Sequence, residues 1–394
     1  MGRAKQEWME AQERGWTAPD NKFVCEQCVA DSHLGSVIRA HASEKSCSYC
    51  GDEAERPIAA PLDVLVGSVA ETVHHYFGDP ADVGVPWDEG EYCADLMETG
   101  DVLQALGVEW RDELFEDVAE SFDTLEWVRA AYGHWASSYD HEVLSDSWNA
   151  FANLILYDTR FHFHVAPLEG AEGPQELEPG QILPAIAKVI ESVGLLKVLR
   201  AGSTFHRSRP RPDGATWPVN EQELSAPPSE HARAGRMNPP GISYLYLAFD
   251  AATAIAETTT TPSTVAIAEF KATRDLNVVD LTVLPELPSI FDNSKRGRRE
   301  ELLFLQSFTA EISKPVPKDG TEHLNYVPSQ VVCEYLAQIM RVSDGTTIDG
   351  LVYRSAVHEG GKNLVLFPTD RGWNRSFSTA AFVKAETIST NLAT

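Results

Sequence analysis

The stretch GRMNPPGISYLYLAFDAATAIAE, residues 235–257, joins a Gly/Pro-rich loop, a short apolar strand pattern and an Ala-rich helix pattern. The loop carries Arg236, whose planar guanidinium fits phosphate oxygens. The strand carries Tyr246, whose ring can stack on a flat base or a pyridinium ring. The helix carries Glu257, which we expect to be buried and to oppose a developing positive charge. The stretch therefore predicts a nucleotide-binding cleft between a strand and a helix.

The segments around this stretch read as short strands interrupted by two helices. β-branched and aromatic residues predict strands at 264–270, 277–281, 351–354 and 364–367. Apolar spacing predicts helices at 298–308 and 330–340. The Pro-rich loop of residues 210–235 is long for a compact domain, and such loops are usually functional. A Gly-x-Gly-x-x-Gly turn and a Walker loop are both absent, so a Rossmann or P-loop fold has no support.

Further motifs flank the central stretch in a fixed order. Thr204–Arg209 is an upstream strand pattern, Tyr326–Gln330 leads into a helix, and Asp349–Ser355 and Asn363–Phe367 are two closing strand patterns. In this order and spacing the motifs resemble the RES-domain family, NAD-consuming enzymes found mostly as bacterial toxins. The resemblance covers about residues 195–370.

The resemblance places the three residues that give the family its name. Arg207 matches the arginine, with Arg209 next to it on the same strand face, Glu257 matches the glutamate, and Ser329 matches the serine. It implies an α+β fold whose C-terminal RES-type domain is similar to ADP-ribosyltransferases. It also implies NAD+ as the substrate.

Cleavage of the nicotinamide–ribose bond sets the roles that we expect for these side chains. The nicotinamide leaves as a neutral pyridine, so the reaction needs stabilisation of an oxocarbenium-like sugar rather than a general acid. Glu257 is the expected electrostatic stabiliser, Tyr246 holds the nicotinamide face, and Arg207 clamps the diphosphate. Ser329 would hydrogen-bond the nicotinamide ribose or a phosphate. The other expected ligand contacts are Arg236, which shares the diphosphate, Asn238 and Ser355.

Each assignment has a structural alternative. Glu257 could be a plain carboxylate at a helix end, and Arg236 could brace its own loop. Tyr246 could be a core residue, with Tyr244 on the same strand face as its substitute. Ser329 also stands where the second helix should start, so its hydroxyl could be the helix cap.

Two Cys-x-x-Cys pairs stand near the N-terminus. Cys25, Cys28, Cys47 and Cys50 form them, with eighteen residues between the pairs. This spacing is typical of a tetrahedral zinc site with four cysteine ligands, which would be structural because four thiolates leave no open position. His33 or His41 replacing one cysteine is the alternative ligand set. The two remaining cysteines, Cys93 and Cys333, are expected to be buried packing residues.

The segment after the cysteines reads as helical from about residue 60 to 165. Apolar residues recur at helical spacing from Leu62 to Phe77 and from Leu114 to Val128. A cysteine knot and helices ahead of a RES-like region resemble the HEPN-type N-terminal domains that accompany some RES domains. Some HEPN proteins are ribonucleases in which four to six residues separate an arginine from a histidine, and Arg129 with His134 fits that spacing. We expect these two residues to be a solvated helix end instead.

Composition limits the location and the partners of the chain. Its 394 residues suffice for two domains, and a formal net charge of −27 disfavours nucleic acid and anionic membranes. The N-terminus lacks the apolar core of a signal peptide, which predicts a cytoplasmic protein. We expect a zinc knot at 1–56, a HEPN-like domain at 57–165, an acidic Gly/Pro-rich linker at 166–181 and a RES-like domain at 182–385.

The sequence thus predicts an NAD+-degrading glycohydrolase or phosphorylase, a toxin of a toxin–antitoxin or anti-phage defence system. The alternatives are a mono-ADP-ribosyltransferase that modifies a macromolecule, a HEPN-type RNase toxin, and a module that only senses NAD. Inorganic phosphate as the acceptor, an antitoxin or immunity protein as partner, and a homo-oligomer stay open at this point.

Overall fold

A computed structural model describes residues 14–165, 177–259, 263–314, 320, 322–369 and 377–390. The chain divides into two compact units, residues 1–140 with 287–300, and residues 141–286 with 301–394. The expected linker lies mostly outside the described residues, and its last residues, Pro179–Gln181, begin a helix of the second unit. Our four domain limits therefore stay predictions.

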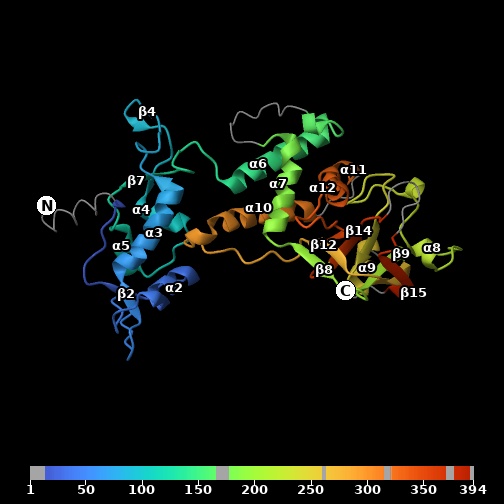
Figure 1. The fold of residues 1–394 in the computed structure, drawn as a ribbon, viewed down its shortest axis with the longest axis horizontal. Coiled ribbons are helices and arrows are strands. Elements are labelled where there is room, and N and C mark those ends of the chain that lie inside the picture. Colours follow the sequence, from blue (N-terminus) through green and yellow to red (C-terminus); the bar gives the residue numbers. More distant parts are fainter. Residues whose placement is uncertain are drawn as a thin grey trace. The chain divides into compact units, whose positions relative to one another are not determined.

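The first unit combines helices with small strands (Figure 1). Most of its buried apolar residues form one cluster, and Val83, Val85, Val128 and Ala130 form a second, smaller one. The longest complete helix of the unit is α3, in which Leu62, Val66, Val69 and Val73 are buried, as the helical spacing predicts. The elements are β1 (Phe23–Cys25), α2 (Ser32–Ala40), β2 (Ala59–Pro61), α3 (Leu62–Tyr76), β3 (Phe77–Gly78), β4 (Trp87–Asp88), β5 (Glu91–Tyr92), β6 (Met97–Glu98), α4 (Thr99–Ala105), α5 (Asp112–Ala119) and β7 (Glu126–Arg129).

The helical prediction fails at the end of this unit. Helix α5 ends at Ala119, and Glu126–Arg129 is strand β7, paired with β3 and β6. Along β7 the side chain of Trp127 is fully buried, whereas Leu125 just before the strand is 79% exposed. The apolar residues from Leu125 to Val128, which suggested a helix, therefore lie in and just before a short strand. This strand is part of the small sheet formed with β3 and β6.

The second unit contains an eight-stranded sheet and several helices. Its elements are α6 (Asp140–Asn153), continued by a π-helical turn (Leu154–Asp158), α7 (Pro179–Ser192), β8 (Leu196–Leu199), β9 (Thr204–Pro210), α8 (Glu221–Leu224), β10 (Leu245–Ala248), α9 (Ala251–Thr258), β11 (Ser263–Ala272), β12 (Leu276–Asp280), α10 (Arg296–Ser313), α11 (Glu322–Asn325), α12 (Val327–Gln338), β13 (Gly350–Arg354), β14 (Lys362–Leu366) and β15 (Ala380–Thr390). The first turn of α10, up to Glu300, is assigned to the first unit.

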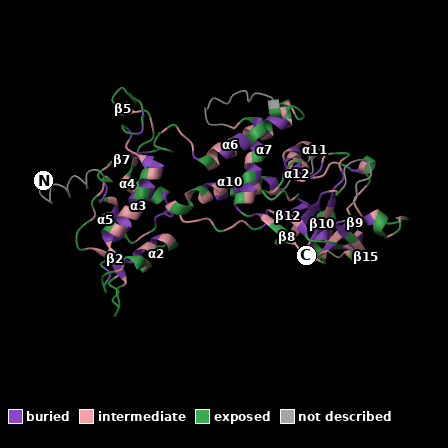
Figure 2. Ribbon diagram, viewed as in Figure 1, coloured by how far each residue is buried: buried purple, intermediate pink, exposed green. Residues whose placement is uncertain are grey.

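The sheet has the order β15-β11-β9-β10-β14-β13-β12-β8. All neighbouring strands are antiparallel except β12 and β13, which are parallel. Strands β10 and β12 are mostly buried, as Figure 2 shows. The segregated helices and mostly antiparallel strands make this an α+β architecture, as expected. The four predicted strands and both predicted helices are present, each shifted by a few residues at its ends.

Short connections bring the central stretch of the sequence together. Strand β10 leads through Phe249 and Asp250 directly into α9, and the carboxylate of Asp250 caps that helix by accepting from the Thr253 amide at 2.7 Å. Helix α9 contacts β9, β10, β11 and β14. Among the described residues, no helix combines the length and apolar character that a bilayer crossing requires.

Candidate functional site

The four cysteines of the two Cys-x-x-Cys pairs converge in the first unit. The sulfur atoms are 3.7 Å apart for Cys25 and Cys28, 3.5 Å for Cys25 and Cys50, and 3.6 Å for Cys28 and Cys47. A tetrahedron with zinc–sulfur bonds of about 2.3 Å has edges of roughly 3.8 Å. The Cys25 amide also donates to the Cys47 sulfur at 3.4 Å. The donor set and its spacing therefore fit one tetrahedral metal ion such as zinc.

The backbone around Cys47 favours its thiolate, whereas burial raises the pKa of the Cys28 and Cys50 thiols. Burial raises the pKa of the Cys47 thiol, but the backbone amides of Cys50, Tyr49 and Cys25 outweigh it and leave that pKa at about 7. Neither alternative histidine joins the cluster. His33 faces Asp292 at 3.8 Å, and the ring of His41 bonds the Val37 carbonyl. Within the described part of the chain, only these four cysteines form a group suited to a metal ion.

The other two cysteines differ from each other. Cys333 is fully buried in α12, as expected, and burial raises the pKa of its thiol. Cys93, however, is exposed, so our expectation of a packing residue is wrong for it. It follows the short β4–β5 hairpin, whose residues Trp87 and Glu91 are also exposed. Its neighbours Tyr92 and Ala94 pack against a small apolar cluster, whereas the Cys93 side chain itself stays exposed.

A cavity of about 430 Å³ lies in the second unit, at the place where β9, β10 and α9 meet. Four of the predicted site residues line it: Arg207, Arg236, Tyr246 and Glu257. Side chains to which the sequence had given no role also line it, among them His206, Ser208, Tyr326, Tyr353, Val357 and Asn363. The central stretch of the sequence and its flanking motifs therefore meet at one cavity.

Arg207 lies on β9 and has few partners of its own. Its Nη1 donates to the backbone oxygen of Tyr246 at 2.9 Å, and its Nε is buried without a hydrogen-bond partner among the described residues. No carboxylate in that part of the chain lies within ion-pairing distance. Burial, and secondly the charge of Arg209, lower the pKa of Arg207 to about 10. A half-buried guanidinium with one backbone hydrogen bond and no carboxylate partner is suited to an anionic ligand.

Arg236 is engaged with the chain itself. Its guanidinium donates to the backbone oxygens of Ile312 at 3.2 Å and of Lys314 at 2.8 Å, at the C-terminal end of α10. A cation at this position satisfies carbonyls that the helix leaves unpaired. This geometry fits the alternative in which Arg236 braces its own loop. A contact between Arg236 and a phosphate of the substrate stays a prediction.

Tyr246 ties its strand to the loop that precedes it. Its hydroxyl accepts from the Met237 amide at 3.0 Å and donates to Asn238 Oδ1 at 2.7 Å. Burial raises the pKa of this hydroxyl, so it stays protonated and able to donate. A Cβ on Gly235 would lie 2.7 Å from the same hydroxyl oxygen, so the close approach of the loop requires glycine here.

Two neighbours of Tyr246 do not reach the cavity. Asn238 is buried, and its amide donates to the backbone oxygens of Arg233, Pro239 and Ile242. It shapes the loop, whereas we had expected a ligand contact. Tyr244 is buried beside Phe367, with ring centres 5.1 Å apart, and precedes β10. It therefore does not line the cavity beside Tyr246.

Glu257 is near the end of α9 and is exposed, not buried as we had expected. Two polar side chains near the cavity hold its carboxylate instead. Its Oε1 accepts from Ser355 Oγ at 2.7 Å and from Asn363 Nδ2 at 2.6 Å. Ser355, predicted as a ligand contact, thus bonds the carboxylate. Asn363 was missed, although an asparagine at the start of an apolar strand signals a buried polar group that needs a partner.

Ser329 lies behind the cavity wall. Its hydroxyl donates to the backbone oxygens of Arg236 and Tyr326. Next to it, Gln330 Nε2 donates to the backbone oxygens of Gly235 at 2.8 Å and Asn238 at 3.0 Å. The cap prediction for Ser329 is wrong, because Tyr326 is the N-cap of α12 and makes no side-chain cap bond. Ser329 and Gln330 instead hold the Gly235–Asn238 loop in place.

The RNase motif of the first unit does not lie on a helix. Arg129 ends β7, with its guanidinium 4.6 Å from the centre of the Tyr139 ring. His134 lies in the following turn, and its Nδ1 accepts from the Ala136 amide at 3.1 Å. The expected helix end is therefore absent, and so is the helical frame on which the motif would depend.

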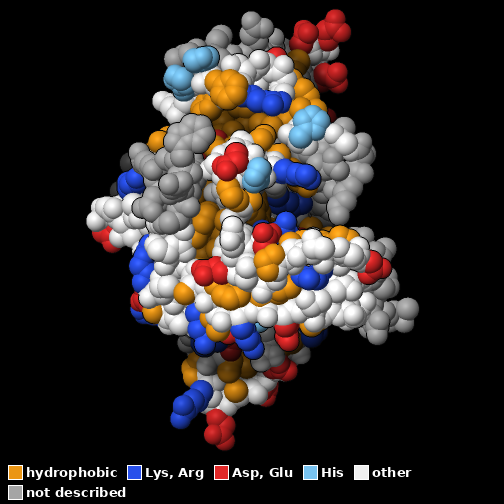
Figure 3. Space-filling view, turned by 90° about the vertical axis from the view of Figure 1, so that its right-hand side faces the viewer, with side chains coloured by type: hydrophobic (Ala, Val, Ile, Leu, Met, Phe, Trp, Pro, Cys, Tyr) orange, Lys and Arg blue, Asp and Glu red, His pale blue; other side chains and the backbone are white. Residues whose placement is uncertain are grey.

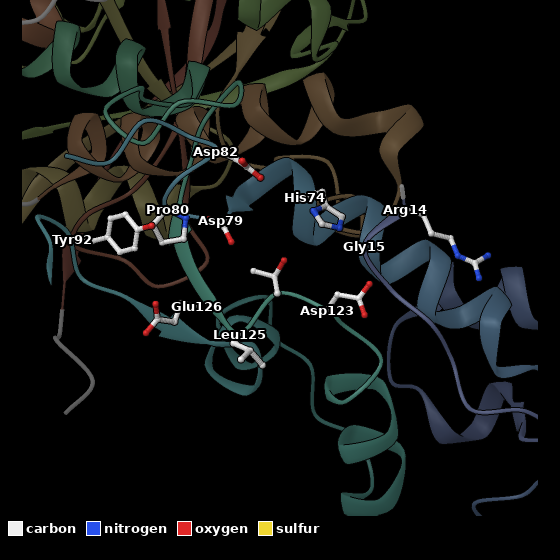
Figure 4. A pocket seen from close by; sticks show the side chains of 11 residues that line it. Arg14, Gly15, His74, Asp79, Pro80, Asp82, Tyr92, Asp123, Leu125 and Glu126 are labelled. Carbon is white, nitrogen blue, oxygen red and sulfur yellow. The ribbon is translucent and has the colours of Figure 1, made fainter. Parts of the chain in front are cut away.

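A second cavity, of about 750 Å³, lies in the first unit (Figure 4). The side chains around it include four carboxylates beside His74 and Arg14: Asp79, Asp82, Asp123 and Glu126. This concentration of negative charge repels phosphates. Among the described residues on the face shown in Figure 3, basic and acidic side chains are interspersed and form no continuous basic surface. Of these two cavities, the one in the second unit is therefore better suited to an anionic nucleotide.

The fold and the site define a two-part protein with a four-cysteine cluster suited to a metal ion and a cavity lined by arginine and glutamate. Two family models match it: HEPN/RES N-terminal domain 1 over residues 40–168 and RES domain over residues 206–377. No curated protein and no solved structure matches the chain. The chain belongs to the RES-domain family and carries a HEPN/RES-type N-terminal domain. The RES family is associated with NAD-processing enzymes.

Proposed function

We propose that the RES domain degrades NAD+ by cleaving the bond between nicotinamide and ribose. One observation carries the proposal: a single cavity is lined by the carboxylate of Glu257 and by the guanidinium of Arg207, whose Nε has no hydrogen-bond partner among the described residues. NAD+ has a diphosphate, which is anionic before and during the reaction, and a ribose that becomes cationic in the transition state. An arginine beside the diphosphate and a glutamate beside the ribose match this distribution of charge.

The bond change needs little proton transfer. The C1′–N bond breaks and its electron pair stays on the ring nitrogen. The pyridinium therefore leaves as neutral nicotinamide. Water then bonds to C1′ through its oxygen and one of its protons passes to solvent, which gives ADP-ribose. Alternatively, an anionic oxygen of inorganic phosphate bonds to C1′ and gives the phosphorylated form without loss of a proton. Glu257 stabilises the sugar cation, and the ring of Tyr246 orients the nicotinamide. Arg207 holds the diphosphate.

Arg236 and Ser329 contribute differently in this proposal. Arg236 contributes its backbone loop to the cavity wall, and its guanidinium reaches a phosphate only by leaving the Ile312 and Lys314 carbonyls. Ser329 acts from behind the wall, through its bond to the Arg236 carbonyl. An ADP-ribosyltransferase-like core remains part of the proposal.

Zinc is the metal that we propose for the cysteine cluster, with a structural role. Four thiolates fill a tetrahedral shell, so the ion supplies folding free energy to the first unit and no catalytic water. Cys25, Cys28 and Cys47 belong to the apolar core of that unit, which couples the metal site to its packing.

For the cell we propose a cytoplasmic toxin or defence effector that depletes NAD+, restrained by an antitoxin or immunity protein. Family membership supports this role. The acidic chain, with its net charge of −27, supports a small substrate over a nucleic acid.

Product analysis tests the chemistry. Pure protein incubated with NAD+, with and without phosphate, should accumulate nicotinamide and free ADP-ribose or phosphorylated ADP-ribose. The same cleft would serve a mono-ADP-ribosyltransferase, which would release nicotinamide only when a macromolecular acceptor is added. Nicotinamide release that depends strictly on such an acceptor would replace our proposal with that alternative. Tight NAD+ binding with no product at all would leave a sensor module.

A further inference from the structure

The carboxylate of Glu257 is held from one side only. Both donors, Ser355 Oγ and Asn363 Nδ2, bond the same oxygen, Oε1, at 2.7 and 2.6 Å. Oε2 has no hydrogen-bond or ion-pair partner among the described residues. A carboxylate only accepts hydrogen bonds, so the amide nitrogen of Asn363 must face it. The hydrogen-bonding chemistry of the carboxylate therefore fixes which way the Asn363 side-chain amide is turned.

The two donors lie on a strand of the sheet and directly after one. Asn363 is 3% exposed, and on β14 it lies between Ala248 of β10 and Tyr353 of β13. Ser355 directly follows β13, where its Oγ also accepts from the His358 amide at 3.0 Å. A hydroxyl that accepts one hydrogen bond is a stronger donor in its next one.

The turn that carries Ser355 is fastened to α9 at a second point. His358 Nδ1 and Thr253 Oγ1 are 2.8 Å apart, and Thr253 is fully buried near the start of α9. The Thr253 hydroxyl also bonds the Asp250 carboxylate at 2.7 Å. A Cβ on Gly361 would lie 2.6 Å from Thr253 Oγ1, so the turn and the helix touch. The turn is thus bonded to α9 at Thr253 near its start and at Glu257 near its end.

We propose that Ser355 and Asn363 are positioning residues that act through Glu257. They fix Oε1 and leave Oε2 free for the ribose of the substrate, at its 2-hydroxyl and anomeric carbon. The inference rests on the proposed function. It adds that the β13–β14 turn, and not α9 alone, sets the geometry of the reacting carboxylate.

The test compares kcat and KM for NAD+ cleavage in Ser355→Ala, Asn363→Leu and Ser355→Thr. Ser355→Ala and Asn363→Leu should each lower kcat by about tenfold with KM nearly unchanged, since a hydrogen bond to a charged group is lost. Ser355→Thr keeps the hydroxyl and should retain activity near wild type. Ser343→Ala removes a similar serine–glutamate bond, to Glu191, away from the cavity and is the matched control.

A second comparison separates positioning from a structural effect. In a Glu257→Gln background, Ser355→Ala and Asn363→Leu should add less than about twofold, because the carboxylate through which they act is already gone. The inference would be overturned if each substitution lowered kcat in the Glu257→Gln background by the same factor as in wild type. It would also be overturned if the single variants raised KM without lowering kcat. Should Asn363→Leu fail to fold, Ser355→Ala decides alone. If wild-type protein releases no nicotinamide, the proposed function fails instead, which is a different outcome.

Discussion

Arg207 Nη1 on β9 donates to the backbone oxygen of Tyr246 on the neighbouring strand β10, at 2.9 Å. This bond orients the guanidinium toward the cavity while its Nε stays unpaired. The strand that carries the proposed stacking ring therefore also orients the proposed diphosphate ligand. Binding and orientation of NAD+ should depend on the same pair of strands.

Replacing Arg207 with alanine should weaken NAD+ binding. The diphosphate is charged in both the ground state and the transition state, so the dissociation constant should rise by about 10- to 100-fold, the size of a lost charge-assisted hydrogen bond. Calorimetric titration measures it. Arg200→Ala is the matched control, because Arg200 is an exposed arginine paired with Asp275. Unchanged affinity in Arg207→Ala would refute the diphosphate assignment.

Removing only the hydroxyl of Tyr246 should separate its two roles. Tyr246→Phe keeps the ring but frees the Met237 amide and Asn238 Oδ1, so we expect a several-fold rise in KM from a loosened loop. Tyr246→Ala also loses stacking and should lower kcat as well. Steady-state kinetics distinguish the two. Equal effects of both substitutions would show that the ring contributes nothing.

The cysteine cluster should bind one zinc ion per chain. Cys25→Ser or Cys47→Ser should lose the metal and lower the thermal stability of the first unit, because metal binding is coupled to folding. Metal analysis and calorimetry measure both quantities. Cys93→Ser alters an exposed cysteine outside the cluster and should change neither. Well-folded native protein without zinc would contradict the assignment.

Substitution of the RNase motif should not affect NAD+ loss. Arg129 packs on Tyr139 and His134 bonds its own turn, both in the first unit. Arg129→Ala and His134→Ala should therefore cleave NAD+ at the wild-type rate. RNA cleavage by wild-type protein that disappears in these variants, together with loss of toxicity, would favour the ribonuclease alternative.

The sequence predicted the parts of the molecule that depend on local pattern. Helix α3 shows sustained helical spacing, the two Cys-x-x-Cys pairs bring their own ligands together, and β11 to β14 are mostly apolar runs that contain β-branched or aromatic residues. The sequence failed at Leu125–Val128, because a few apolar residues at mixed spacing fit either a helix or a strand. Tertiary pairing with β3 and β6 decided in favour of the strand.

The candidate site was predictable in its residue types but less so in its contacts. Arg207, Arg236, Tyr246 and Glu257 all line one cavity, as the motif order suggests. The partners of Glu257 come from residues about a hundred positions away, and no local pattern announces them. The bonds of Arg236 to the end of α10 depend likewise on tertiary packing. These contacts follow from the packing of the unit and not from any motif.

The central claim is that Glu257 stabilises the transition state of NAD+ cleavage. The most direct measurement is a time course of nicotinamide release by NMR for wild type and Glu257→Gln, with and without phosphate. We predict that the rate falls by about 10²–10³ in Glu257→Gln while NAD+ affinity changes little, since the charge that Glu257 opposes exists mainly in the transition state. Nicotinamide release by Glu257→Gln at the wild-type rate would contradict the account.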